Sequence, residues 1–159
     1  MSVPPPHALG PPLIGALLRM PVDAVWRAII DALHEAGYTD LTPAHIPFLR
    51  YPGPQGQRPI DLAAEAGMTK QAMNYLLGQL EAAGYLERRV DPNDSRSRRV
   101  YPTSRGEAIA KITRDTVRDL ERAWAKKLGP DDLEQLRSLL VRLNEITLDG
   151  RTVPLADAD

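Results

Sequence analysis

The sequence predicts a mainly α-helical protein with one small β-hairpin, and two observations lead to this prediction. Apolar residues recur at steps of three and four over most of the chain, which is the period of an amphipathic helix. Residues 85–101 instead contain two short strand-like runs on either side of polar turn residues. Phe48 is the only phenylalanine, so we expect a core of Leu, Ile, Val and Ala packed between helices.

Two helices are predicted before residue 37. Residues 13–20 suit a short helix, and Pro21 fits the first position of a second helix that runs to about Ala36. Gly37 is placed to end it. Its expected buried face consists of Val22, Val25, Trp26, Ile29, Ile30 and Leu33.

A short helix and a loop are predicted next. Thr42 and Pro43 form a cap and first-turn pair for a helix that extends to about residue 50. Residues 51–57, YPGPQGQ, read as a loop because of their proline and glycine content.

A helix–turn–helix is predicted over residues 59–83. The first helix covers residues 59–66, with Leu62 and Ala63 facing inward, and Gly67 ends it. Thr69 can cap a second helix that runs from Lys70 to about residue 83, where Gly84 stops it. The expected buried stripe of this second helix is Ala72, Leu76, Leu77, Leu80 and Ala83. The tight spacing allows the two helices to cross at a steep angle.

The hairpin is predicted from strands at residues 85–90 and 98–101, with DPNDSRS as the turn between them. Ser104 and Glu107 then form a capping box for a long helix to about Leu128. After a break at residues 129–132, leucines repeat near heptad spacing in a last helix. The apolar seam of the long helix is too extended for so small a core to cover. We therefore predict a winged helix-turn-helix head joined to a helical dimerisation region.

The expected organisation has five parts. They are a proline-rich arm at 1–20 with a short helix, N-terminal helices at 21–57 on the dimerisation side, a winged helix-turn-helix DNA-binding region at 58–102, C-terminal dimerisation helices at 103–149, and a tail at 150–159. The 159 residues suit one domain with an oligomerisation extension. The absence of cysteine excludes disulfides and thiolate metal sites and fits a cytoplasmic protein. No apolar run approaches the length of a membrane span.

The second helix of the helix–turn–helix presents a polar face suited to DNA. Asn and Gln side chains can pair in a bidentate way with adenine, and Thr can contact a thymine methyl group or a phosphate. Lys70 lies at the helix start, where free backbone amides also favour phosphate. The predicted recognition residues are Thr69, Lys70, Gln71, Asn74 and Tyr75. An ordinary solvated helix face would show the same pattern.

The hairpin is rich in arginine. Residues 88–99 contain five arginines and two aspartates, a local charge of +3 in a chain of net charge −1. A tip carrying Arg96 can enter a narrow minor groove, where negative potential is concentrated. Asp91 and Asp94 would oppose phosphate binding if unpaired, so we expect at least one to pair with a wing arginine and fix the tip. The predicted DNA-contacting arginines are Arg88, Arg96, Arg98 and Arg99, with Arg89 beside them. The alternative is a solvated charged hairpin.

Two short motifs carry a resemblance to a known family. DPNDSR at residues 91–96 follows a hydrophobic strand, and TSRG at residues 103–106 follows the second strand. With these motifs, residues 59–107 resemble the winged-helix domain of the MarR family of bacterial transcriptional regulators, and the order of elements fits from about Pro21 onward. The Val-Tyr-Pro end of the second strand and the proline-rich YPGPQG loop depart from the family pattern.

The resemblance implies a homodimer with interleaved terminal helices that binds a pseudo-palindromic operator in double-stranded DNA, usually as a repressor. It implies that residues 70–75 read the major groove and that Arg96 reaches the minor groove. By analogy with the family's pocket, a small aromatic or phenolic effector would bind beside Trp26, His34, Tyr38 and His45. Plain core packing explains these four residues equally well.

A competing hypothesis is a winged-helix interaction module that dimerises and binds a protein partner without reading DNA. The near-neutral charge allows it, whereas the density of arginine in the hairpin argues against it. No nucleophile elbow, phosphate loop or paired carboxylates of an enzyme occur. The first two helices could bring His34 and Glu35 near His45, but the chain has no His pair at i, i+4 and no Cys, so no metal site is expected. No cofactor is expected either. The sequence therefore predicts a ligand-responsive, DNA-binding transcriptional regulator.

Overall fold

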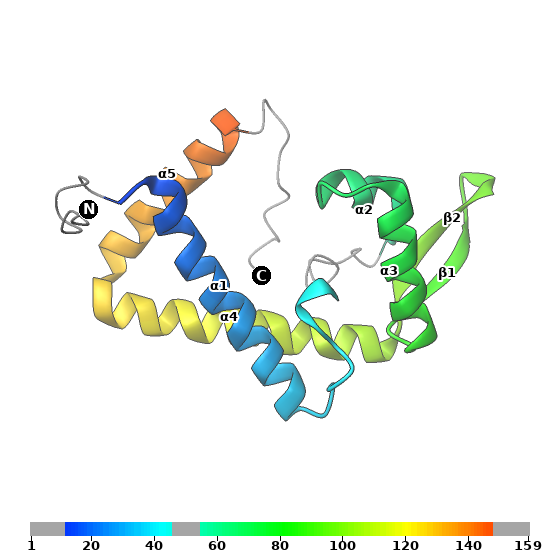
Figure 1. Ribbon diagram of the computed structural model, residues 1–159, viewed down its shortest axis with the longest axis horizontal. Helices are drawn as coiled ribbons and strands as arrows, with labels where there is room; N and C mark the ends of the chain where they lie inside the picture. Colours follow the sequence, from blue (N-terminus) through cyan, green and yellow to red (C-terminus); the bar gives the residue numbers. More distant parts are fainter. Residues whose placement is uncertain (1–11, 46–54, 148–159) are drawn as a thin grey trace, which may run out of the picture.

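The computed structural model describes residues 12–45 and 55–147, and these residues form five α-helices and one two-stranded antiparallel sheet (Figure 1). The elements are α1 (Ile14–Glu35), α2 (Pro59–Glu65), α3 (Lys70–Ala82), β1 (Leu86–Asp91), β2 (Asp94–Pro102), α4 (Ser104–Leu128) and α5 (Pro130–Thr147). The predicted fold class, mainly α-helical with a small hairpin after a helix–turn–helix, is confirmed.

The long helix α4 organises the molecule. Helix α1 crosses it, α5 packs against its C-terminal part, and α2, α3 and the hairpin gather at its N-terminal end (Figure 1). The head that holds the helix–turn–helix therefore lies at one end of α4, and α5 packs against α4 at the other end.

Helix α1 is one continuous helix, so the predicted break at Pro21 is wrong. Proline keeps a helical φ, although it lacks the N–H that would bond to the carbonyl of Leu17 and its ring crowds that carbonyl, so a helix can pass through it at a cost. Val22, predicted to be buried, is 45% exposed; the buried residues lie further along, at Ile29, Ile30 and Leu33. Gly37 ends the helix as predicted, with a φ of 91°.

The short helix predicted after α1 can be compared with the structure only at its start. Pro43–His45 form one 3₁₀ turn, in which the backbone N–H of His45 donates to the Thr42 carbonyl at 2.9 Å. The rest of the predicted short helix and residues 51–54 of the predicted loop lie outside the described residues. The end of that loop is not free, because Gln57 pairs with Val100 of β2 through both of its backbone groups.

The helix–turn–helix is confirmed, with one change in its buried stripe. Gly67 takes a φ of 63° after α2, and the Thr69 hydroxyl caps α3 by accepting from the Ala72 N–H at 3.2 Å. The buried residues of α3 are Met73, Leu77 and Leu80, so Met73 replaces the predicted Ala72 at the centre of the stripe. The predicted Leu76 and Ala83 pack at its margin.

The hairpin is longer than predicted and its turn is shorter. Strands β1 and β2 pair from Leu86↔Pro102 to Asp91↔Asp94, so only Pro92 and Asn93 remain in the turn. Residues 94–97, predicted as turn, therefore belong to β2. The two aspartate side chains close the tip, because Asp91 accepts from the Asn93 N–H at 2.9 Å and Asp94 from the Arg96 N–H at 3.0 Å.

Helix α4 begins one residue earlier than the predicted capping box implies. The cap is Thr103, whose hydroxyl oxygen accepts from the Gly106 N–H at 3.2 Å and donates to the Gly84 carbonyl at 2.6 Å. Ser104 is instead the first helical residue. Because Thr103 also bonds to Gly84, it is Thr103 that caps α4 and not Ser104. The predicted end of α4 at Leu128 and the break at Gly129 are confirmed.

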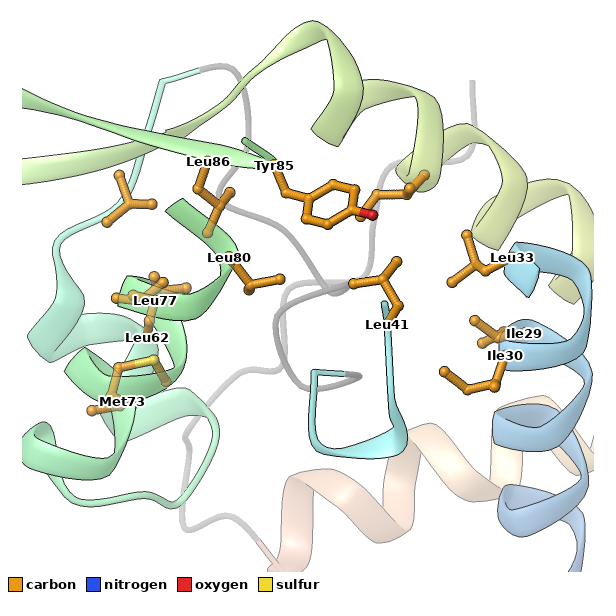
Figure 2. Close-up of a cluster of buried hydrophobic side chains, with 13 residues drawn as sticks. Ile29, Ile30, Leu33, Leu41, Leu62, Met73, Leu77, Leu80, Tyr85 and Leu86 are labelled. Atoms are coloured by element: carbon orange, nitrogen blue, oxygen red, sulfur yellow. The ribbon is translucent and has the colours of Figure 1, made fainter. Parts of the chain in front are cut away.

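The core lies between α1, the helix–turn–helix, the hairpin and the start of α4 (Figure 2). Helix α5 contributes no buried residue to it. Exposed large apolar side chains instead collect on the first half of α1, at the end of α4 and along α5: Leu13, Ile14, Leu17, Met20, Val22, Leu128, Leu136, Leu139, Leu143 and Ile146. None of the described helices combines the length and apolarity that crossing a membrane requires.

Candidate nucleic-acid interface

Helix α3 lies beside the hairpin in the head (Figure 1). On α3, Lys70 and Gln71 are exposed at the first turn and Tyr75 is 68% exposed one turn later. Thr69 lies at the helix start, where its hydroxyl is the N-cap. The first-turn amides and the outward side chains of α3 are thus presented on the same part of the head.

Asn74 is half-buried and is held on two sides. Its Nδ2 donates to the Lys70 carbonyl at 3.0 Å, and its Oδ1 accepts from Nη1 of Arg88 at 3.2 Å. Arg88 also donates from Nε to Oε2 of Glu81 at 3.1 Å. Two residues that the sequence predicts as separate DNA contacts therefore contact each other across the helix and the hairpin.

A second chain of polar contacts reaches Tyr75 from the segment after α1. Nε2 of Gln79 donates to the Tyr75 hydroxyl at 3.2 Å, and Nε2 of His45 lies 3.4 Å from Oε1 of Gln79. The backbone N–H of Thr42 donates to Nδ1 of His45 at 3.1 Å. The ring nitrogens of His45 thus both have hydrogen-bond partners beside α3.

Arg96 and Arg98 are the open arginines of the wing. Both are exposed, and neither side chain has a hydrogen bond or ion pair within the part of the chain that the structure describes. Because side chains alternate along a strand, they share the face of Val100. Val100 pairs with Arg88, whose guanidinium reaches α3. The two free cations therefore extend the α3 surface towards the hairpin tip.

Arg99 lies on the opposite face of the sheet and is engaged inside the protein. Its Nε donates to Oδ2 of Asp91 at 2.8 Å, and its Nη1 donates to the carbonyls of Gly56 and Gln55 at 3.0 and 3.3 Å. The Asp91 side chain is only 4% exposed. The Asn93 N–H and the Arg99 guanidinium hold the pKa of the Asp91 carboxyl below its usual value. The expected pairing of an aspartate with a wing arginine is therefore present, and it ties the hairpin to residues 55–56.

Arg89 is likewise engaged. It forms an ion pair with Glu87, and its guanidinium lies 4.8 Å from the centre of the Tyr101 ring. Of the five hairpin arginines, only Arg96 and Arg98 thus keep side chains without such partners among the described residues.

The four residues predicted to line an effector pocket do not converge. A hollow of about 560 Å³ on α1 is lined by Asp23, Trp26, Arg27, Ile30, Asp31 and Pro43, which includes only one of the four. His34 bonds to the Leu41 carbonyl at 2.8 Å, and Tyr38 packs against Tyr85 with ring centres 6.1 Å apart. No group of three metal-ligating side chains occurs among the described residues.

A polar connection between the head and the segment after α1 was not predicted. Tyr85 is buried, and its hydroxyl donates to Oδ1 of Asp40 at 2.5 Å while it accepts from Nη2 of Arg105 at 2.9 Å. Burial and the Asp40 carboxylate raise the pKa of the Tyr85 phenol. The guanidinium also lies 4.5 Å from the centre of the Tyr85 ring. The position of Arg105 inside the TSRG motif was the one available signal.

Comparison with known proteins agrees with this architecture. Residues 39–97, which contain the helix–turn–helix and most of the hairpin, match the model of the MarR family. The apo form of MarR from E. coli is 26% identical, with a TM-score of 0.63 over 84% of this chain and 97% of that one. A Mycobacterium tuberculosis MarR family protein in complex with salicylic acid is 28% identical, with a TM-score of 0.61 over 85% and 98%.

A third similar structure is the transcriptional repressor CouR bound to a 23-mer DNA duplex. It is 24% identical, with a TM-score of 0.64 over 82% of this chain and 92% of that one, and at this identity the likeness concerns the fold. The head thus matches the MarR family model, and the chain shares the winged-helix fold of MarR family transcription regulators over most of its length.

Proposed function

We propose that the protein is a sequence-specific DNA-binding transcriptional regulator that acts as a homodimeric repressor on a pseudo-palindromic operator. The observation that carries this proposal is the continuous surface formed by the exposed face of α3 and the unpaired Arg96 and Arg98 of the hairpin. In this proposal residues 58–102 contact DNA, and residues 21–57 and 103–149 form the dimer. Such a regulator acts in the cytoplasm, where bacterial chromosomal DNA lies.

The surface divides into parts that give affinity and parts that give specificity. Lys70, the first-turn amides of α3, and the wing arginines Arg96 and Arg98 suit phosphate and minor-groove contacts, which carry most of the affinity. Gln71, Asn74 and Tyr75 suit base edges in the major groove. Arg99, engaged with Asp91 and two carbonyls, holds the wing instead of meeting DNA.

A second copy of the chain would cover the apolar side chains that one protomer leaves open. They line α5 and the first half of α1, at the end of α4 away from the head (Figure 1). A dimer joined there would carry two heads, and binding to one face of B-DNA requires two recognition helices about 34 Å apart.

The hollow on α1 is the proposed effector site. Trp26, Ile30 and Pro43 offer an apolar surface to an aromatic ring, and the salicylic acid complex of a family member supports a ligand of this class. Such a ligand can act only by favouring one spacing of the two heads over another.

Trp26 supplies a direct test, because the chain has only one other tryptophan, Trp124. Titration with salicylate should change the fluorescence of the wild type and of Trp124→Phe, and leave that of Trp26→Phe unchanged. A change that survives in Trp26→Phe would place the ligand elsewhere.

The experiment that tests the function is selection of bound duplexes from random DNA by the purified protein at two salt concentrations. We expect enrichment of an inverted repeat whose half-sites are one helical turn apart. Weak retention without any preferred sequence, falling steeply with salt, would favour the alternative of an interaction module that does not read DNA.

A further inference from the structure

Arg88 differs from the open wing arginines in its contacts. Its side chain is 27% exposed, and its guanidinium is shared between Oε2 of Glu81 at 3.1 Å and Oδ1 of Asn74 at 3.2 Å. Both partners belong to α3, whereas Arg88 belongs to β1. The side chain thus spans from the wing to the recognition helix and ends beside a carboxamide on the reading surface.

These contacts determine the orientation of the Asn74 carboxamide, that is, the positions of its Oδ1 and Nδ2 atoms. A guanidinium can only donate, so the atom facing Arg88 is Oδ1. A backbone carbonyl can only accept, so the atom facing Lys70 is Nδ2. The orientation of the amide is therefore set by the protein before any DNA is bound.

The fixed carboxamide keeps the groups that base recognition needs. After its two internal bonds, Asn74 retains one N–H on Nδ2 and one lone pair on Oδ1. A donor beside an acceptor is the pair that complements N7 and the N6 amino group of adenine in the major groove. If Arg88 were absent, the side chain would have to select this orientation at the moment of binding, at an entropic cost.

The charge of Arg88 is also largely compensated. Glu81 pairs with its Nε, so Arg88 brings little uncompensated positive charge to the interface. Arg96 and Arg98 have no such carboxylate among the described residues. Affinity from the release of counterions depends on cations that neutralise phosphates, and Arg88 is poorly placed to be one of them.

We propose that Arg88, held by Glu81, is a positioning residue that fixes the Asn74 carboxamide for base recognition and makes no phosphate contact of its own. The inference rests on the proposed function, because it specifies how the DNA-reading surface obtains its selectivity. It gives two arginines of the same hairpin different roles: Arg88 positions Asn74, and Arg98 contacts phosphate.

The experiment compares Arg88→Gln with the matched control Arg98→Gln on selected DNA. First, Asn74→Ala identifies the base pair whose preference Asn74 sets. Affinities for the operator, for the operator changed at that pair and for random duplex are then measured at four salt concentrations.

For Arg88→Gln we expect a loss of operator affinity of about 5- to 150-fold, the range for one bidentate base contact, with relaxed preference at the Asn74 pair. Random-duplex affinity and the salt slope should stay at wild-type values. Arg98→Gln should instead weaken all three duplexes alike and lower the salt slope by about one. In an Asn74→Ala background, Arg88→Gln should add no further loss.

Other results would overturn the inference. If Arg88→Gln behaves as Arg98→Gln does, Arg88 is a phosphate contact. If it still costs affinity in the Asn74→Ala background, it does not act through Asn74. Glu81→Gln is a second variant in case Arg88→Gln does not fold, because it loosens Arg88 without removing it. Glu81→Gln should relax the preference at the same base pair. Unchanged preference at that pair would count against the proposal.

Failure of the proposed function is distinguishable from these results. It would appear in the wild type, as the absence of any preferred sequence, before a variant is measured. A wild type that selects an operator, together with an Arg88→Gln variant that keeps full preference at the Asn74 pair, would refute the positioning role alone.

Discussion

The Asp91 carboxylate fixes the hairpin at the scale of a single residue. It accepts from the Asn93 N–H and from Arg99, and these bonds lower its pKa in the folded protein. A lowered folded pKa means that the carboxylate stabilises the fold fully above its unfolded value of about 3.9, and that this stability is lost as pH falls through the folded pKa. Asp91→Asn should therefore melt at a lower temperature than the wild type at pH 7, with the difference narrowing below about pH 4.

Circular dichroism melts between pH 7 and pH 2.5 measure this difference. Asp94→Asn is the matched control, because Asp94 is exposed and, within the described part of the chain, its carboxylate accepts only from the Arg96 backbone N–H. It should show a smaller difference at pH 7. A difference for Asp91→Asn that does not change with pH would contradict the electrostatic account.

The first turn of α4 depends on a glycine where it meets the start of the hairpin. A Cβ on Gly106 would lie 2.2 Å from the backbone oxygen of Tyr85 and 3.3 Å from Cβ of Pro102. Since a backbone carbonyl cannot rotate away as a flexible side chain can, Gly106→Ala should destabilise the protein by about 1–3 kcal/mol, the range for overpacking.

Chemical denaturation measures the effect, with Gly78→Ala on α3 as the control. A Cβ on Gly78 meets nothing within 4 Å, so the better helix propensity of alanine should make that variant as stable as the wild type or more so. Equal stability of Gly106→Ala and the wild type would show that α4 and Tyr85 can move apart without cost.

Local signals allowed the helix–turn–helix to be predicted, and tertiary contacts account for what was missed. Gly67 and the Thr69 cap act within a few residues, so their role is readable from sequence. The choice of Thr103 over Ser104 as a cap depends on a bond to Gly84, 19 residues away in the chain. No pattern along the chain records that contact.

The same distinction applies to the candidate interface. The exposure of Arg96 and Arg98 follows from a polar hairpin tip, and the sequence indicated them as DNA contacts. The pairing of Arg88 with Asn74 depends on how the hairpin meets α3, which the sequence does not record. The sequence could therefore indicate the residues of the surface, but it could not separate side chains that are exposed without partners from side chains that are engaged inside the protein.

At the scale of the molecule, α4 joins the head to the apolar end. Tyr85, Asp40 and Arg105 link the hairpin, the segment after α1 and the first turn of α4 through bonds of 2.5 and 2.9 Å. A change in the position of α1 relative to α4 must therefore strain this junction or move the head with it. The hollow that we propose as the effector site lies on the element that such a movement would involve.

Dimerisation is the property on which two-headed DNA binding depends. Leu139 on α5 is 51% exposed, and α5 supplies no buried residue to the core of the protomer. Leu139→Glu should therefore leave the fold of one protomer intact while placing a charge in the apolar surface that we assign to the second copy. Analytical ultracentrifugation should give a dimer for the wild type and a monomer for Leu139→Glu at micromolar concentration.

Ile60→Glu is the matched control for the dimer test, because Ile60 is 54% exposed on α2 in the head. It should remain dimeric with an unchanged circular dichroism spectrum. The Leu139→Glu monomer should also lose most of its operator affinity, since each head would bind a half-site without the effective concentration that its partner supplies. A Leu139→Glu variant that still sediments as a dimer would exclude α5 from the interface, and the apolar half of α1 would then have to form it alone.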